Sequence, residues 1–269
     1  MKDLFTRDFG RRRFLMGMIH TLPLPGAPRY DRAGGPRKIV AQAREEAKIL
    51  AEAGFHALLY CNESDMPYLT EMEPATIAAM TEVVAETQAL IGLPHGINML
   101  LDPAASLAIA NATGGRFIRA FLTGATVGDT GLFVADGPGV LRLRANLGAE
   151  DIRIICNVTP GFSVSLDSRP VEEQAAGAVF IGLADAVCVS GPAAGREADL
   201  DLLRRVAARV PETPVVVGTG VSAANIEALA EVADGFIVGT SLKINGQTLN
   251  PLDPVRVKEF MAVARKLDV

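Results

Sequence analysis

Short apolar runs alternate with amphipathic stretches along the whole chain. The runs predict buried strands, and the stretches between them carry apolar residues at helical spacing. We expect eight strands at residues 14–20, 57–60, 95–100, 116–121, 152–158, 186–190, 214–218 and 235–239. The clearest helices are expected at residues 37–53, 74–90, 103–112, 200–210, 223–231 and 254–267.

Strict alternation of strands and helices favours parallel pairing with right-handed crossovers. Eight units favour closure into a (β/α)8 barrel over an open doubly wound sheet, and no G-x-G-x-x-G motif follows the first strand. The chain has 269 residues, and one barrel of about 250 residues accounts for nearly all of them. We therefore predict an α/β protein with a single barrel domain over residues 1–269, in which residues 1–13 form a short N-terminal extension.

Charge and cysteine content narrow the classes of partner. The formal net charge is −5, so no broad basic surface is expected and nucleic acid is excluded as a partner. Cys61, Cys156 and Cys188 form no C-x-x-C pair, which disfavours a disulfide framework or a structural zinc site and suits a reducing cytoplasm.

Residues 11–15 resemble a twin-arginine export signal, but the apolar run after them stops at His20 and Pro23. No apolar run is long enough to cross a bilayer. We expect a cytoplasmic protein without membrane insertion, and a homo-oligomer because barrels commonly self-associate.

Two glycine-rich turns follow the last two expected strands. The first contains Gly218, Gly220 and Val221, and the second contains Gly239, Thr240 and Ser241. Backbone N–H groups in such turns can approach an anion closely, and barrels often bind phosphate after strands 7 and 8. The alternative is that Gly220 and Ser222 only turn the chain and cap the next helix.

Two charged or titratable side chains fall where a barrel places its active site. His20 ends the first strand at the catalytic face, whereas His56 and His95 lie at the opposite face, where a structural role is expected. Arg119 interrupts an apolar strand, so it requires either a carboxylate partner or an anionic ligand.

Several polar residues near other strand ends are further candidates for the site. Asn98 and Asn157 could contact substrate, although Asn98 could equally belong to a core network. Asn62 and Asp65 follow the second strand, with a simple turn as the alternative. Asp129 lies in the long, glycine-rich connection over residues 122–139, which is typical of a lid.

The lysines and acidic residues limit the possible chemistry. Lys243 alone among the lysines lies near a strand end, which disfavours Schiff-base mechanisms. No cluster has the spacing of a transition-metal site, so no cofactor is predicted. Asp65 and Asp129 could together hold Mg²⁺ through a ligand phosphate, and metal dependence stays open.

Three motifs resemble the BtpA/SgcQ family over nearly the whole chain. They are Gly17-Met18-Ile19-His20-Thr21-Leu22-Pro23-Leu24-Pro25-Gly26-Ala27-Pro28, Gly218-Thr219-Gly220-Val221-Ser222-Ala223-Ala224-Asn225 and Ala233-Asp234-Gly235-Phe236-Ile237-Val238-Gly239-Thr240-Ser241-Leu242-Lys243, with Phe117-Ile118-Arg119 between them. The resemblance implies a barrel of the ribulose-phosphate-binding type. It also implies a setting in photosystem I biogenesis for one member and in sugar metabolism for others.

The chain resembles a divergent member of that family. It has Cys61 where the family pattern implies an acidic residue, and Asn157, Gly161 and Phe162 where the pattern implies a lysine and a histidine. The leading hypothesis is an enzyme, an isomerase, lyase or hydrolase, that acts on a sugar phosphate or nucleoside-derived phosphate. In it, His20 transfers a proton with help from Asp65 or Asp129. The alternative is a barrel that binds a phosphorylated ligand without turnover and serves as a regulatory or assembly factor.

Overall fold

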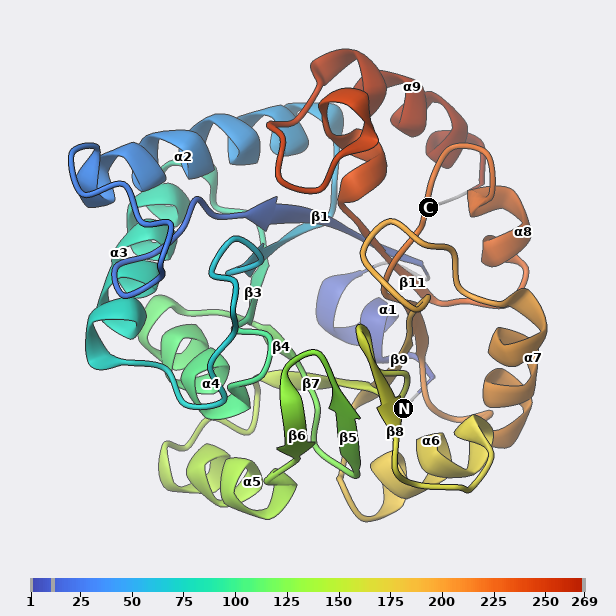
Figure 1. The fold of residues 1–269 in the computed structure, drawn as a ribbon. Coiled ribbons are helices and arrows are strands. Elements are labelled where there is room, and N and C mark those ends of the chain that lie inside the picture. Colours follow the sequence, from blue (N-terminus) through green and yellow to red (C-terminus); the bar gives the residue numbers. More distant parts are fainter. Residues whose placement is uncertain (1, 11–12, 268–269) are drawn as a thin grey trace.

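The computed structural model describes residues 2–10 and 13–267. Within this part of the chain, eight parallel strands close into a barrel, with β11 pairing back to β1 (Figure 1). In order around the barrel they are β1 (Phe14–His20), β2 (Ala57–Cys61), β3 (His95–Asn98), β4 (Phe117–Ala120), β7 (Arg153–Asn157), β9 (Ala186–Val189), β10 (Val215–Val217) and β11 (Gly235–Val238). The predicted strands and the (β/α)8 fold class are confirmed.

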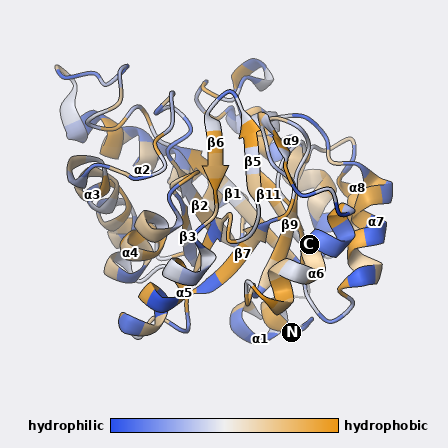
Figure 2. Cartoon of the chain, turned by 60° about the horizontal axis from the view of Figure 1, so that its bottom comes forward, coloured by the Kyte–Doolittle hydropathy of each residue, from blue (hydrophilic) through white to orange (hydrophobic). Residues whose placement is uncertain are grey.

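Helices surround the barrel and turn their apolar sides toward it (Figure 2). They are α2 (Gly35–Ala53), α3 (Pro74–Ile91), α4 (Pro103–Thr113), α5 (Gly137–Asn146), α6 (Val171–Phe180), α7 (Leu200–Arg209), α8 (Ile226–Ala230) and α9 (Pro254–Ala264), with short 3-10 turns η1 (Thr240–Leu242), η2 (Ile244–Gly246) and η3 (Arg265–Leu267). The expectation that Ser222 caps a helix is wrong. Helix α8 begins at Ile226 after Asn225, whose side-chain oxygen accepts the Ser222 N–H at 2.8 Å.

The core has two parts because side chains alternate between the two faces of each strand. The larger part lies between the barrel and the helices, and includes Leu15 and Ile19. The smaller part fills the lower and middle barrel interior, and includes Phe14, Met16 and Met18. The interior position that follows Met18 on β1 is His20, so the apolar filling ends one level below the upper mouth.

A short helix, α1 (Leu4–Phe9), closes the lower end of the barrel. The ring of Phe9 stacks on Phe14 with centroids 4.3 Å apart, and Phe5 stacks on the same ring at 5.2 Å. Part of the expected N-terminal extension is therefore packed into the lower core. Residues 11 and 12 of the arginine run lie outside the described residues. No helix in the described residues is long and apolar enough to cross a membrane.

A small antiparallel sheet stands over the upper end of the barrel, and the sequence analysis missed it. It contains β5 (Ala125–Gly128), β6 (Gly131–Val134) and β8 (Ser163–Ser165), in the order β6-β5-β8 (Figures 1 and 2). The connection expected as a long loop after β4 is thus a hairpin, and the connection after β7 adds the third strand.

Candidate functional site

The uppermost level of the barrel interior consists of polar residues and glycine. Strand alternation brings one residue from each strand, or from the position directly after it, to this level. These residues are His20, Cys61, Asn98, Arg119, Asn157, Ser190, Gly218 and Gly239. Polar side chains above an apolar interior mark the catalytic end of this fold.

Two adjoining cavities open at this level. The first, about 190 Å³, is lined by both glycine turns and by His20; we call it the glycine-turn cavity. The second, about 300 Å³, lies under the small sheet and is lined mainly by apolar and aromatic side chains; we call it the aromatic cavity. Five residues line both cavities and so form their common wall: Glu63, Asn98, Arg119, Ala194 and Thr219.

All six residues expected to hold phosphate line the glycine-turn cavity: Gly218, Gly220, Val221, Gly239, Thr240 and Ser241. Gly220 has φ +72°, and a Cβ there would clash with the carbonyl oxygen of Arg196. A Cβ on Gly218 would lie 2.8 Å from the Arg119 guanidinium. Glycine is therefore required at both positions for the turns to pack as they do.

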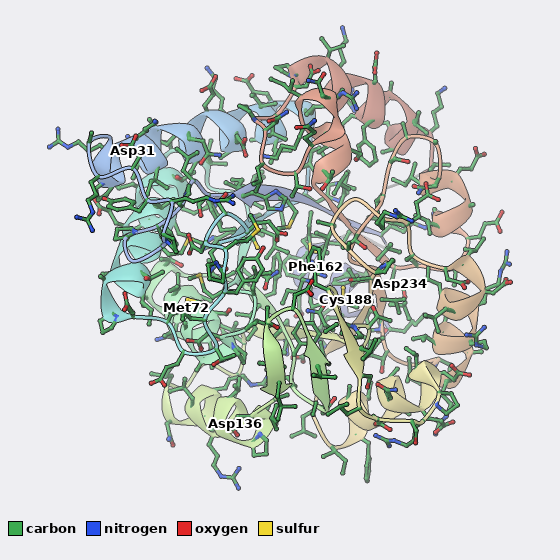
Figure 3. All side chains as sticks on the ribbon, in the orientation of Figure 1. Asp31, Met72, Asp136, Phe162, Cys188 and Asp234 are labelled. Carbon is green, nitrogen blue, oxygen red and sulfur yellow. The ribbon has the colours of Figure 1, made fainter. Side chains whose placement is uncertain are left out.

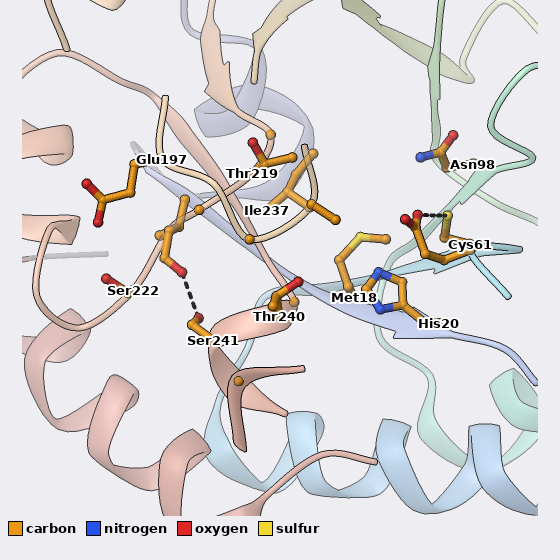
Figure 4. A pocket seen from close by; sticks show the side chains of 18 of the residues that line it. Met18, His20, Cys61, Asn98, Glu197, Thr219, Ser222, Ile237, Thr240 and Ser241 are labelled. Carbon is orange, nitrogen blue, oxygen red and sulfur yellow. Dashed lines mark hydrogen bonds between the residues drawn. The ribbon is translucent and has the colours of Figure 1, made fainter. Parts of the chain in front are cut away.

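The two turns are joined and leave donors unused. The Ser241 hydroxyl donates to the Val221 carbonyl oxygen at 2.7 Å, which ties the turns together (Figure 4). Among the described residues, no hydrogen bond is made by the backbone N–H groups of Gly220, Val221, Thr240 and Ser241. Unpaired N–H groups at turns and helix starts are suited to an anion. An acidic residue, Glu197, lies at the cavity rim, but its exposed carboxylate points away from Thr240 and His20 (Figure 4).

His20 is held as a neutral imidazole. Its Nδ1 lies 3.3 Å from the Thr248 carbonyl oxygen, which can only accept, so Nδ1 carries the proton and Nε2 is an acceptor. Burial, together with the charges of Lys243 and Arg119, lowers the pKa of His20 to about 3. An anion bound in the cavity would offset those charges and strengthen His20 as a base.

Arg119 is bound only by neutral groups. Its guanidinium donates to Asn157 Oδ1 and Ser190 Oγ, both at 2.9 Å, and to the Gly218 carbonyl oxygen at 3.3 Å. Within the described ranges no carboxylate forms a salt bridge with it. Of the two explanations for a charge in this strand, the structural ion pair is absent from the described residues, which leaves a cation available to an anionic ligand.

Glu63 is a functional candidate that the sequence analysis missed. Burial raises the pKa of Glu63, and the nearby Arg119 opposes that shift. The Cys61 thiol lies 3.7 Å from a Glu63 oxygen (Figure 4), and burial raises the pKa of Cys61 well above its usual value, so the sulfur stays protonated. The residue lies in an irregular connection between two candidates, Asn62 and Asp65, where no periodicity indicates which side chain faces the cavity.

Asn62 and Asp65 lie outside both cavities. Asp65 accepts the Leu24 N–H at 2.8 Å with one oxygen and the Asn62 amide at 3.1 Å with the other. The pair thus ties the connection after β1 to the connection after β2. Asp129 lies in the exposed β5–β6 turn and lines the aromatic cavity. The structure does not bring Asp65 and Asp129 together, and no group of three metal-ligating side chains occurs in the described residues.

Asn98 lines the cavities as predicted, whereas Lys243, the one lysine near a strand end, lies outside them. Asn98 accepts the Leu100 N–H at 3.1 Å and turns its amide nitrogen toward the glycine-turn cavity (Figure 4). Lys243 is fully buried with both Glu46 oxygens at 2.8 Å. None of the lysines in the described part of the chain lines either cavity.

Comparison with known proteins identifies the family. The BtpA family model matches residues 11–266. The chain belongs to the BtpA family. It is 36% identical to the putative sgc region protein SgcQ of Escherichia coli K12, over 94% of each chain. It is 34% identical to the photosystem I biogenesis protein BtpA of Synechocystis, over 96% of this chain and 90% of that one.

The fold itself is shared more widely. Phosphoribosyl anthranilate isomerase from Thermus thermophilus aligns over 94% of this chain and 99% of its own, with a TM-score of 0.57 and 11% identity. This BtpA-family chain therefore has the TIM-barrel fold. Two positions at which we expect departures from the family pattern lie at the site: Cys61 lines the glycine-turn cavity, and Phe162 lines the aromatic cavity.

Proposed function

We propose that this chain is an enzyme that binds the phosphate of a small phosphorylated metabolite in the glycine-turn cavity. The observation that carries the proposal is the meeting of unpaired backbone donors from two consecutive turns with Arg119, a cation that forms no salt bridge with a carboxylate in the described part of the chain. Both kinds of group gain from an anion between them. A sugar phosphate or a nucleoside-derived phosphate has the required group.

The two titratable groups on the cavity wall suit proton transfer. Burial raises the pKa of Glu63 and lowers the pKa of His20, so one tends to hold a proton and the other to lack one. Such opposed shifts are typical of acid and base pairs. In this proposal Glu63 takes the role that the sequence analysis gave to Asp65 and Asp129, and Asn98 orients polar groups of the substrate. Isomerisation, elimination and hydrolysis all use such a pair.

The other unresolved features are part of the same proposal. We expect a cytoplasmic homo-oligomer, which size-exclusion chromatography with light scattering would test for its oligomeric state. Mg²⁺ could enter with the ligand phosphate, with Asp129 as a nearby acidic group in the aromatic cavity. Titration of the phosphate complex with EDTA would show whether binding needs the metal.

Thermal unfolding with inorganic phosphate and ribose 5-phosphate tests the phosphate site. At concentrations about 100-fold above Kd, binding should raise Tm by about 5 °C. Gly220→Val should abolish that shift, because its Cβ would meet the backbone of residues 196 and 197. Gly177→Ala is the matched control, since a Cβ there meets only the Arg169 guanidinium at 3.7 Å. Stabilisation by neither compound, or stabilisation unchanged in folded Gly220→Val, contradicts the proposal.

Measuring turnover distinguishes an enzyme from a barrel that binds a phosphorylated ligand without converting it. Compounds that stabilise the chain are assayed for consumption with the unaltered protein, His20→Ala and Glu63→Gln. Loss of a proton-transferring group should reduce turnover about 10²- to 10⁴-fold while the phosphate still binds. Binding of every stabilising compound without turnover would favour a regulatory or assembly factor, the alternative that the expected loss of a lysine and a histidine after β7 favours.

A further inference from the structure

The aromatic cavity has no role in holding phosphate, yet it is the larger of the two cavities. Aromatic residues make up 5% of the chain, and four of them line this one space: Tyr68, Phe121, Phe133 and Phe162. They come from the connections after β2, β4 and β7 and from the small sheet. Segments far apart in the sequence therefore bring rings together above the barrel mouth.

Some residues that line the aromatic cavity are packed firmly, and others have a strained backbone. Phe133 is buried and packs edge to face on Phe121 with ring centroids 5.8 Å apart. Phe162 has φ +55° and Leu100, which also lines the cavity, has φ +43°, and both are in the left-handed region that side chains rarely adopt. Strain of this kind clusters at ligand sites.

Phe162 is held in place although it is half exposed. Its N–H donates to the Pro192 carbonyl oxygen at 3.2 Å, and its own carbonyl oxygen accepts the Asp129 N–H at 3.3 Å. Its side chain remains 49% exposed near the middle of the barrel mouth (Figure 3). An aromatic ring on a strained, anchored backbone that buries little surface contributes little to folding, so contact with a ligand explains it better.

The two cavities meet at Glu63, one member of the proposed acid and base pair, whereas His20 lines only the glycine-turn cavity. Glu63, Asn98 and Arg119 are part of their common wall, so a molecule with its phosphate on the glycine turns would extend past Glu63 into the aromatic cavity. Asp129 lies in the wall of that second space and disfavours another anionic group there. The geometry points to a substrate that is a phosphate ester carrying an uncharged aromatic or heteroaromatic ring, with the ring against Phe162 and Phe133. This inference rests on the proposed function.

Calorimetric titration compares ligands with and without a ring. The probes are ribose 5-phosphate, the nucleotides UMP and AMP, and phenyl phosphate with inorganic phosphate as its partner. Stacking in the aromatic cavity should make at least one ring-bearing probe bind about 10-fold or more tightly than its ringless partner. Phe162→Ala should reduce that preference to about threefold or less and leave ribose 5-phosphate binding unchanged. Phe180→Ala is the matched control, since Phe180 is 80% exposed and lies outside both cavities.

A second variant tests the cavity by filling it. Thr130 is exposed and lines the aromatic cavity, so Thr130→Trp should block ring-bearing probes while ribose 5-phosphate still binds. If ribose 5-phosphate binds and no ring improves affinity, or if the preference survives both variants, this inference fails and the phosphate site stands. If none of the phosphorylated probes binds, both proposals fail.

Discussion

Two arginines on neighbouring strands of the barrel have opposite surroundings. Arg153 begins β7 at the lower end, where its guanidinium lies 2.6 Å from Asp8 and 3.5 Å from Asp185. Arg119 lies near the upper end of β4, where its partners are an amide, a hydroxyl and a carbonyl. The lower cation is neutralised within the fold, and the upper one is held in place without being neutralised.

Burial by itself does not distinguish the upper end of the barrel from the lower end. His20 at the upper end and His95 at the lower end are both buried, and burial lowers the pKa of each, to about 3 and about 4. His95 bonds Thr113 on the adjoining helix, whereas His20 faces a cavity. A shifted pKa therefore marks a buried group, and open space beside the group marks a candidate for function.

The largest effect on stability is expected at a third cation, Lys243. It is 1% exposed and pairs with Glu46, whose carboxylate also accepts the Leu252 N–H at 3.2 Å. Lys243→Met should lower the free energy of unfolding by about 3–5 kcal/mol, because it leaves a buried carboxylate without its cation. Urea unfolding followed by circular dichroism measures the change.

The double variant Lys243→Met/Glu46→Leu provides the control for that prediction. Replacing a whole buried pair by apolar groups is often nearly neutral, so the double variant should recover at least about half of the loss. If the single and double variants are equally unstable, the ion pair is not the source of the effect.

A smaller effect follows from the two buried histidines. Each binds a proton in the unfolded chain below about pH 6.5 but stays neutral in the folded chain down to about pH 3 or 4. Their contribution is therefore fully present above pH 6.5 and is lost as pH falls toward the folded pKa. Between pH 7 and pH 5 each should remove about 2 kcal/mol from the free energy of unfolding.

Variants separate the histidines from the acidic groups. The raised pKa values of Glu63 and Asp65 act in the opposite direction at low pH. Urea unfolding at pH 7 and pH 5 is therefore compared between the unaltered chain, His20→Gln and His95→Gln. Each variant should lose about 2 kcal/mol less than the unaltered chain over that interval. An unchanged difference in His20→Gln would mean that His20 is protonated in the folded protein at pH 5.

Arg153→Met tests the neutralised arginine at the lower end. Its ion pairs are only partly exposed, so their loss should cost about 1–3 kcal/mol of the free energy of unfolding. Phosphate affinity should not change, because Arg153 lies at the far end of the barrel. A fall in phosphate affinity at equal stability would show that the two ends are coupled.

The barrel could be predicted from sequence because each strand is a short apolar run and the runs alternate with helices. The small sheet could not, since β8 has three residues and pairs with β5 from a segment more than 30 positions away. Its strands contain glycine and serine, which carry little strand signal. Pairing between distant short segments is decided by tertiary packing and not by local pattern.

The site residues on strands could be predicted from sequence, whereas those on the irregular connection after β2 could not. His20, Asn98 and Arg119 lie on strands, where the alternation of side chains brings them to one level, and the sequence analysis selected all three. Glu63 and Asp65 lie on an irregular connection, where side-chain direction depends on contacts such as the Leu24 N–H bond to Asp65. The sequence pattern therefore indicated Asp65, which lies outside both cavities, and not Glu63, which lines both.

Arg119→Met should have the smallest effect on stability and a large effect on binding. Its three acceptors border a cavity that water can enter, so the free energy of unfolding should change by no more than about 0.5 kcal/mol. Phosphate affinity, measured by calorimetry, should fall about 10- to 100-fold because a charge-assisted contact is lost. Arg153→Met, on the neighbouring strand, is the matched control. It should lower the free energy of unfolding and leave phosphate affinity unchanged. If Arg119→Met instead destabilises the fold as much as Arg153→Met and leaves phosphate affinity unchanged, both arginines serve the fold and the upper cavity does not bind an anion.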